Sequence, residues 1–200
     1  RMQFACLTKL NMSDSSDQVA GVLAPVTSLR HKGDLGIGDV GGLRKLVGWA
    51  VDHEVKFLQL LPINETGADD SPYNAISSVA LEPSLIDLSS VPEIGEARVN
   101  EVRAGLSEEF LEGDLVHYEE AKRLKRDLLE EGFAQFEGSE KFEAFCETEK
   151  EWLENYTKFR FLMDQEGGCE TWDLWSINYR DPELAHDFIA KRKGSEERLR

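Results

Sequence analysis

The residues best suited to chemistry lie together in one polar stretch of the sequence, 64–74. It holds two adjacent carboxylates, Asp69 and Asp70, followed by Ser71 and Tyr73. Retaining glycoside chemistry uses two carboxyl groups about 5–5.5 Å apart, but adjacent loop residues rarely point at one substrate from such positions. We therefore expect one of the two aspartates to order the loop by accepting hydrogen bonds from backbone amides, as Asx residues do in turns.

Tyr73 differs from the aspartates. Its ring offers a flat apolar face, and its hydroxyl group both donates and accepts hydrogen bonds. Sugars present apolar C–H faces and many hydroxyl groups, so a tyrosine in a polar loop suits a carbohydrate. A structural role for the ring is the alternative that the residue alone leaves open.

Two other sets of residues have types that could do chemistry, but their spacing does not support a functional site. Ser28, His31 and Asp34 are close in sequence, but a catalytic triad is defined by geometry, and no Gly-x-Ser-x-Gly elbow is present. The segment Gly36-Ile37-Gly38-Asp39 lacks the third glycine of a dinucleotide fingerprint. It predicts a tight turn into a helix.

A strand, a helix and a second strand must position the polar stretch. The apolar runs Val19 to Val26 and Val55 to Leu61 end at turn signals and predict buried strands. Between them, apolar residues at helical spacing predict a helix over 40–53, with Asp39 as its N-cap. This order indicates a βαβ unit with parallel strands. The polar stretch follows the second strand, and parallel α/β folds carry their chemistry on such loops.

The second half of the sequence predicts helices. Asp114 is expected to cap a helix that ends at Gly132. Ser139 is expected to cap another helix, which Gly167-Gly168 ends. We interpret the aromatic and aliphatic stripe of this second helix as core: Phe142, Phe145, Trp152, Leu153, Tyr156, Phe159 and Met163.

Composition excludes several classes of function. The 200 residues carry a formal net charge of −16, which argues against nucleic acid and against an anionic membrane surface. No apolar run approaches the roughly 20 residues that span a bilayer, and we find no secretion signal. Zinc is not expected, because the cysteines show no Cys-x-x-Cys spacing. Reduced thiols in a cytoplasmic protein fit these residues best: Cys6, Cys146 and Cys169.

A set of short motifs in one order resembles the amylomaltases, a family of 4-α-glucanotransferases also called disproportionating enzymes. The best match is Thr66-Gly67 followed by Asp70-Ser71-Pro72-Tyr73. The resemblance is close over residues 20–90 and loose over 90–200. The other segments that carry it are Gly21 to Arg30, Gly36 to Asp39, Phe57 to Pro62, Pro83 with Leu85 to Leu88, and Trp172 to Trp175.

The resemblance implies an α/β fold, the N-terminal part of a (β/α)8 TIM barrel with an inserted, mostly helical subdomain. It implies retaining transfer of 1,4-α-glucan segments between maltooligosaccharides, with no metal and no organic cofactor. Tyr73 would line the donor side of the cleft, with Ser71 and Asp70 in contact or in support. We find no match to the strands that carry the nucleophile and the acid/base, so these are expected beyond Arg200 and no catalytic residue is assigned in this chain.

These expectations divide the chain into three parts. Residues 1–18 are expected to be a disordered polar leader, 19–92 the first βα units of the barrel with the glucan-site loop, and 93–200 the helical insert. Four positions depart from the family pattern: Glu54, Ala68, Asn74 and Ser176. Ala68 replaces a frequent aromatic residue, and Glu54 replaces a frequent glycine, which is expected to alter the turn before the second strand.

Two alternatives to a full-length transferase remain. The chain by itself would be a non-catalytic α-glucan-binding fragment, since two strands cannot close a barrel. The whole protein would otherwise be a hydrolase of the α-amylase clan. Products from maltotriose separate the two enzymes, because a transferase builds a ladder of longer oligomers and a hydrolase only shortens its substrate. The oligomeric state is left open.

Overall fold

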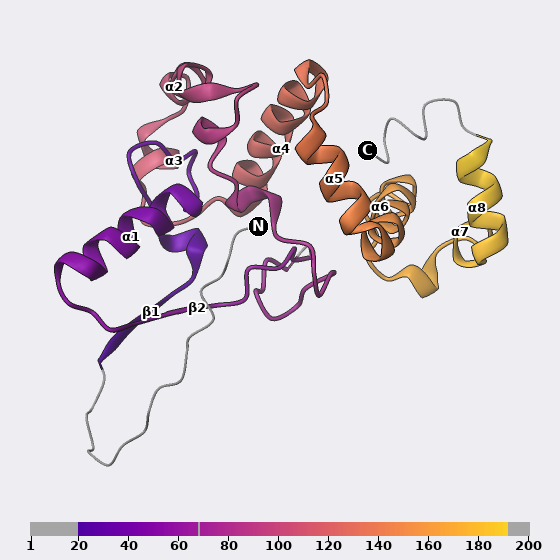
Figure 1. Ribbon diagram of the computed structural model, residues 1–200, viewed down its shortest axis with the longest axis horizontal. Coiled ribbons are helices and arrows are strands. Elements are labelled where there is room, and N and C mark those ends of the chain that lie inside the picture. Colours follow the sequence, from indigo (N-terminus) through magenta and orange to yellow (C-terminus); the bar gives the residue numbers. More distant parts are fainter. Residues whose placement is uncertain (1–19, 68, 192–200) are drawn as a thin grey trace, which may run out of the picture.

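The computed structural model describes residues 20–67 and 69–191, so the expected leader, 1–18, lies outside the described residues (Figure 1). Its first two strands and first α-helix confirm the predicted βαβ unit: β1 (Gly21–Ala24), α1 (Val40–Asp52) and β2 (Phe57–Leu60). The two strands pair in parallel, with Gly21 opposite Phe57 and Ala24 opposite Leu60. Their carboxyl ends therefore lie side by side, and the polar loop begins there.

The sequence determines both ends of α1. Asp39 is the N-cap as predicted, and its carboxylate accepts hydrogen bonds from the amides of Gly41 and Gly42. Beyond the helix, Glu54 has a φ of +56°. This is the left-handed conformation that glycine adopts without steric strain. The turn before β2 is therefore of a kind that glycine also makes.

The prediction of buried strands was wrong for this chain. Leu23 in β1 and Phe57 in β2 expose 56% and 52% of their surface. In the described part of the chain the sheet consists of these two strands alone. Each strand therefore has a neighbour on one edge only.

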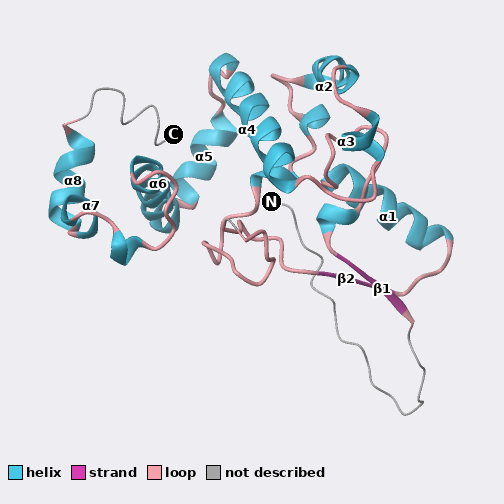
Figure 2. Ribbon diagram, turned by 180° about the vertical axis from the view of Figure 1, so that it is seen from behind, coloured by secondary structure: helices cyan, strands magenta, loops and turns pink. Residues whose placement is uncertain are grey.

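Helices make up most of the remaining structure, as Figure 2 shows. α4 lies between the βαβ unit and the far end of the molecule, where α6, α7 and α8 gather (Figures 1 and 2). The elements in chain order after β1, α1 and β2 are η2 (Pro83–Leu85), η3 (Leu88–Ser90), α2 (Gly95–Ala104), α3 (Glu108–Glu112), α4 (Tyr118–Gln135), α5 (Glu140–Thr148), α6 (Lys150–Gln165), η4 (Trp172–Leu174), α7 (Ile177–Arg180) and α8 (Pro182–Ala190), and η1 (Val26–Ser28) precedes α1.

Both expected ends of α4 were wrong. The helix begins at Tyr118, so Asp114 is not its cap, and it continues through Gly132 to Gln135. Gly132 is a contact point, because a Cβ there would lie 2.9 Å from Ile94 Cγ1. The glycine therefore permits close packing inside the helix and does not end it.

The single helix predicted after Ser139 is two helices. Ser139 caps α5 as predicted, by accepting the Phe142 amide. The chain then breaks at Glu149, whose carboxylate accepts the Trp152 indole N–H at 2.7 Å. The predicted end of α6 is confirmed, since Gly167 and Gly168 both have positive φ.

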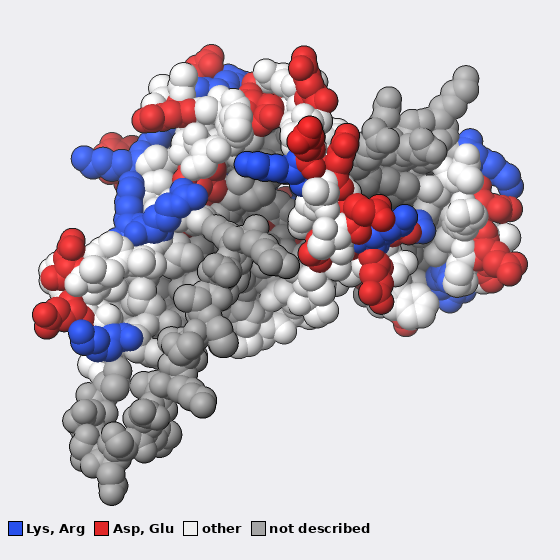
Figure 3. Space-filling view, viewed as in Figure 1, with Lys and Arg blue, Asp and Glu red and all other residues white. Residues whose placement is uncertain are grey.

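Within residues 20–67 and 69–191, buried apolar side chains form two clusters. One joins the α/β part to α2 and α4 and contains Leu35, Leu88, Ile94, Val99 and Leu128. The other holds α6 against α8 and contains Phe161, Leu162, Met163, Trp175, Ala185 and Ile189. Acidic side chains gather over α4 to α6 and over α8 on the face shown in Figure 3, consistent with a solvated helical surface.

Candidate functional site

The loop after β2 folds back on itself. Isolated antiparallel bridges join Asn64 to Leu81 and Thr66 to Ala75. At its tip, the Asp69 carboxylate accepts the Ser71 amide at 3.1 Å and the side-chain amide of Asn74 at 2.9 Å. These two hydrogen bonds, the one from Asn74 first, lower the pKa of Asp69. One of the two adjacent aspartates therefore orders the loop, as predicted.

The three predicted site residues have different surroundings in the structure. Asp70 points its carboxylate at the ammonium group of Lys122, 2.6 Å away. The Ser71 hydroxyl accepts the Tyr73 amide at 3.4 Å, so it helps to shape the turn. Tyr73 is 75% exposed, which leaves its ring open to a ligand. The neighbouring departure from the family pattern, Ala68, lies outside the described residues.

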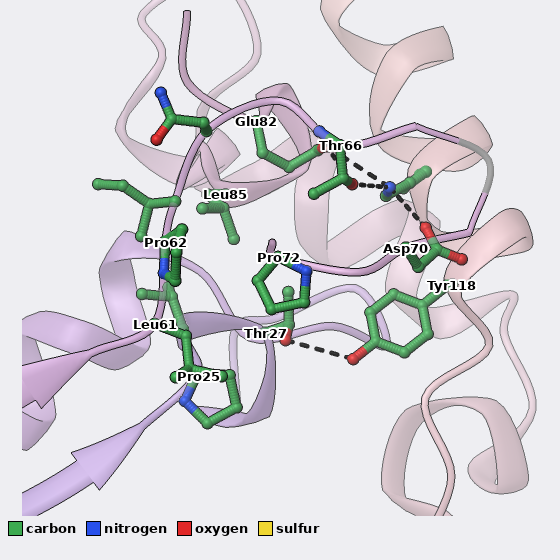
Figure 4. Close-up of a pocket in the computed structure, with 14 residues that line it drawn as sticks. Pro25, Thr27, Leu61, Pro62, Thr66, Asp70, Pro72, Glu82, Leu85 and Tyr118 are labelled. Carbon is green, nitrogen blue, oxygen red and sulfur yellow. Dashed lines mark hydrogen bonds and ion pairs between the residues drawn. The ribbon is translucent and has the colours of Figure 1, made fainter. Parts of the chain in front are cut away.

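A cavity of about 210 Å³ lies where this loop meets the carboxyl ends of both strands (Figure 4). Asp70 is the one predicted site residue that lines it, and α4 closes one side with Tyr118, whose hydroxyl lies 3.3 Å from Thr27 Oγ1. The lining residues are Pro25, Val26, Thr27, Leu61, Pro62, Ile63, Asn64, Thr66, Asp70, Pro72, Glu82, Leu85, Tyr118 and Lys122. Apolar walls with a few polar groups are typical of ligand pockets.

The polar side of the cavity is a charge cluster around Lys122. Its ammonium group donates to Thr66 Oγ1 at 2.9 Å and lies 3.5 Å from Glu82 Oε2. Burial alone would raise the pKa of Glu82. The charge of Lys122 and hydrogen bonds from the amides of Ser84 and Thr66 outweigh burial, and the pKa is lowered. Glu82 is therefore a carboxylate that the cavity holds ionised.

A second cluster holds the start of the same loop from α6. The buried carboxylate of Glu65 accepts a short hydrogen bond from the Tyr156 hydroxyl and lies 3.2 Å from Arg160. Burial raises the pKa of Glu65, although Tyr156 and Arg160 oppose that shift. Burial and the Glu65 carboxylate raise the pKa of Tyr156. The tyrosine is thus a neutral hydrogen-bond donor.

A third charge cluster lies at the N-terminus of α1, and it was not predicted from the sequence. Lys125 of α4 is 1% exposed, and its ammonium group is 2.9 Å from Asp39 Oδ2. It also donates to the carbonyl oxygens of Ser84 and Ile86, at 2.7 and 2.9 Å. The signal was present, because Lys125 lies four residues after Ala121 and three before Leu128 on the apolar face of α4.

The structure does not assemble Ser28, His31 and Asp34 into a triad. The Ser28 hydroxyl donates to the carbonyl oxygen of Pro25, and His31 Nε2 is 2.8 Å from Asp39 Oδ1. In residues 20–67 and 69–191, no three His, Cys, Asp or Glu side chains are grouped so as to hold a metal ion. None of the helices in that same part of the chain is long and apolar enough to cross a membrane.

Comparison with known proteins identifies the family. The family model described as 4-alpha-glucanotransferase matches residues 24–199. The 4-alpha-glucanotransferase of Chlamydia caviae is 35% identical over 166 residues, which are 80% of this chain and 31% of that protein. The 4-alpha-glucanotransferase of Thermus thermophilus is 34% identical over 170 residues, which are 82% and 32%.

A solved structure agrees with this match. An amylomaltase from Streptococcus agalactiae, determined in complex with acarbose, is similar with a TM-score of 0.73 and 26% identity, over 90% of this chain and 36% of that one. The chain spans about a third of the length of the curated relatives named above. The match over residues 24–199 covers most of the sequence, and the chain belongs to the 4-alpha-glucanotransferase family.

Proposed function

We propose that the protein containing this chain is a 4-α-glucanotransferase. It transfers a segment of a 1,4-α-glucan to a new position in an acceptor, glucose or another glucan, with retention of configuration. The observation that carries the proposal is the family match over residues 24–199. The proposal assigns the nucleophile and the acid/base to other parts of the protein, because no segment of residues 90–200 matches the strands that carry them, and the chain spans about a third of its relatives.

The proposal assigns the βαβ unit to the start of a (β/α)8 barrel and the helices after residue 92 to an insert. The position of the loop supports this assignment, since it follows a parallel strand at its carboxyl end, where barrel enzymes carry their sites. No cofactor is required. In the described part of the chain, Cys146 and Cys169 are free thiols, which supports a cytoplasmic location.

Within the loop, Tyr73 is the proposed glucan contact, and Ser71 and Asp70 support it. The side chain is exposed, so its ring and its hydroxyl group are accessible to the hydroxyl groups of a sugar. Asp70 is already paired with Lys122, so it shapes the loop and does not bind the glucan with a free carboxylate. The maltooligosaccharide would therefore meet the ring first.

The test is disproportionation of maltotriose by a protein of the relatives' full length, beside the 200-residue chain. We expect a ladder of longer oligomers and glucose from the longer protein only. Shortened products without a ladder would identify a hydrolase instead, and a ladder from the short chain would place the carboxylates within it. Glucan binding without turnover by the short chain would fit a binding fragment.

The site assignment has its own test. Tyr73→Ala should lower kcat/KM for transfer roughly tenfold or more, because about 1.4 kcal/mol of lost contact corresponds to a factor of ten. Phe145→Ala is the control, since it removes a half-exposed ring of α5 away from the loop. Equal activity of Tyr73→Ala and the unaltered enzyme would remove Tyr73 from the site.

A further inference from the structure

One side chain of α4 contacts the glucan-site loop at several points. The ammonium group of Lys122 reaches Asp70, Thr66 and Glu82, at 2.6, 2.9 and 3.5 Å (Figure 4). Asp70 and Thr66 flank the part of the loop before Tyr73, and Glu82 lies where the loop rejoins the body of the protein. The Lys122 side chain is 18% exposed, so these contacts are largely shielded from water.

The segment around Gly67 and Asp70 has the weakest backbone hydrogen bonds of the loop. The two backbone hydrogen bonds that involve Gly67 are long, 3.4 Å from the Gly67 amide to the Asn74 carbonyl and 3.3 Å from the Asp70 amide to the Gly67 carbonyl, whereas the Asn74 amide donates to the Ser71 carbonyl at 3.0 Å. Asp70 has a φ of +53°, which an aspartate adopts at a steric penalty. A strained residue persists where its surroundings determine its position. Here the ion pair with Lys122 does so.

The charges point to the same role. Asp70 and Glu82 contact one ammonium group, and without it two carboxylates would stand close together beside the cavity. A neutral glucan brings no charge that could replace Lys122. The cluster is therefore complete without a ligand, and the lysine serves the loop and not the sugar.

We propose that Lys122 is a positioning residue for glucan transfer, which fixes the loop so that the Tyr73 ring is correctly placed against the glucan. This inference rests on the proposed function. It gives the helical part a task in the reaction, since a helix of the insert sets the geometry of a loop of the α/β part. The Tyr156 and Arg160 contacts to Glu65 hold the start of the loop independently.

The kinetic test is carried out in a protein of the relatives' length. Lys122→Met should lower kcat/KM for maltotriose disproportionation about tenfold, because a small displacement of a binding group lowers the reaction rate strongly. Lys122→Arg should lose less activity than Lys122→Met, since it keeps a positive charge that can pair with the two carboxylates. The control is Arg123→Met, which removes an exposed charge from the next position of α4 and should leave the rate unchanged.

A second background separates positioning from general stability. If Lys122 acts through Tyr73, Lys122→Met should change kcat/KM less than about twofold in a Tyr73→Ala enzyme. The same tenfold loss in both backgrounds would overturn the proposal. Absence of any ladder from the unaltered enzyme would instead overturn the proposed function, and the following measurement would still decide on Lys122.

Hydrogen exchange tests the loop without reference to activity. In the 200-residue chain, Lys122→Met should speed exchange of the Gly67, Asp70 and Asn74 amides about tenfold and leave the α1 amides unchanged. Asp70→Asn breaks the same ion pair from the loop side, and asparagine tolerates positive φ. It should therefore also speed exchange of the loop amides, which keeps the test available if Lys122→Met does not fold. Loop exchange unchanged in Asp70→Asn would overturn the proposal.

Discussion

Replacing Lys125 by methionine should destabilise the protein more than any single loss of a surface charge. Methionine keeps most of the aliphatic length of the side chain and removes the ammonium group. That group is 1% exposed and is bonded to the Asp39 carboxylate and to two carbonyl oxygens. Removal leaves a buried carboxylate without its cation.

The magnitude follows from these contacts. Removing one partner of a buried ion pair is typically destabilising by about 3–5 kcal/mol. The lower end applies here, because Asp39 keeps its hydrogen bonds from Gly41, Gly42 and His31. A loss of about 3 kcal/mol corresponds to a decrease in Tm of about 6–12 °C for a chain of this size.

The assay is urea unfolding at pH 7, followed by far-ultraviolet circular dichroism. Lys150→Met is the control, since Lys150 is exposed and its ammonium group lies 4.0 Å from Glu154. That variant should stay within about 0.5 kcal/mol of the unaltered chain. The decisive experiment combines Lys125→Met with Asp39→Asn and compares the double variant with each single variant. Asparagine is chosen because it still caps a helix but carries no charge.

The double variant should be more stable than the sum of the single losses predicts, by about 1 kcal/mol or more. Burial lowers the pKa of Lys125 in spite of the nearby Asp39 carboxylate. Burying the charged pair therefore costs free energy of desolvation, and the double variant, in which both partners are neutral, does not have this cost. Strict additivity, or a Lys125→Met variant within about 1 kcal/mol of the unaltered chain, would refute this reasoning.

Three further substitutions test local features. Glu54→Gly should raise the free energy of unfolding by about 0.5–1 kcal/mol, because glycine adopts the φ of +56° without strain, and a thermal melt without an increase in Tm would contradict this. Because the pKa of Glu82 is lowered from its ordinary value of 4.5, the ionised carboxylate stabilises the fold at pH values above 4.5, and this stabilisation is lost as the pH falls. Glu82→Gln should therefore be less stable than the unaltered chain at pH 7, and urea unfolding should show the gap closing below pH 4.5. The contribution of Glu65 to stability has the opposite pH dependence, because its pKa is raised. This contribution is present below pH 4.5 and is lost as the pH rises. Relative to the unaltered chain, Glu65→Gln should gain stability between pH 4.5 and 7, and a constant difference would be inconsistent with the burial of Glu65.

The features that the sequence predicted correctly have local causes. Asp39 caps α1 and Ser139 caps α5 because each side chain reaches amides two or three residues away. Asp69 orders its loop in the same local way. The pairing of β1 with β2 follows from chain order, because strand, helix and strand leave few other arrangements.

The features that were missed depend on residues far away in the sequence. Gly132 stays inside α4 because Ile94 packs against it, and no local signal reports that contact. The position of Lys125 on the apolar face of α4 is a local signal, but its partner Asp39 is 86 residues away, and lysine in a charged helix usually faces water. Strand exposure depends on neighbouring strands. The placement of Tyr73, Ser71 and Asp70 against a glucan stays a prediction.

The same distant contacts determine when the loop can take its shape during synthesis. Glu65 and Tyr156 are 91 residues apart, as are Thr27 and Tyr118. At 5–20 residues per second, a ribosome would add α4 and α6 about 5–20 s after the residues that they hold. The βαβ unit can form early from local contacts, whereas the glucan-site loop must wait for the helices and is the late-folding part of this chain.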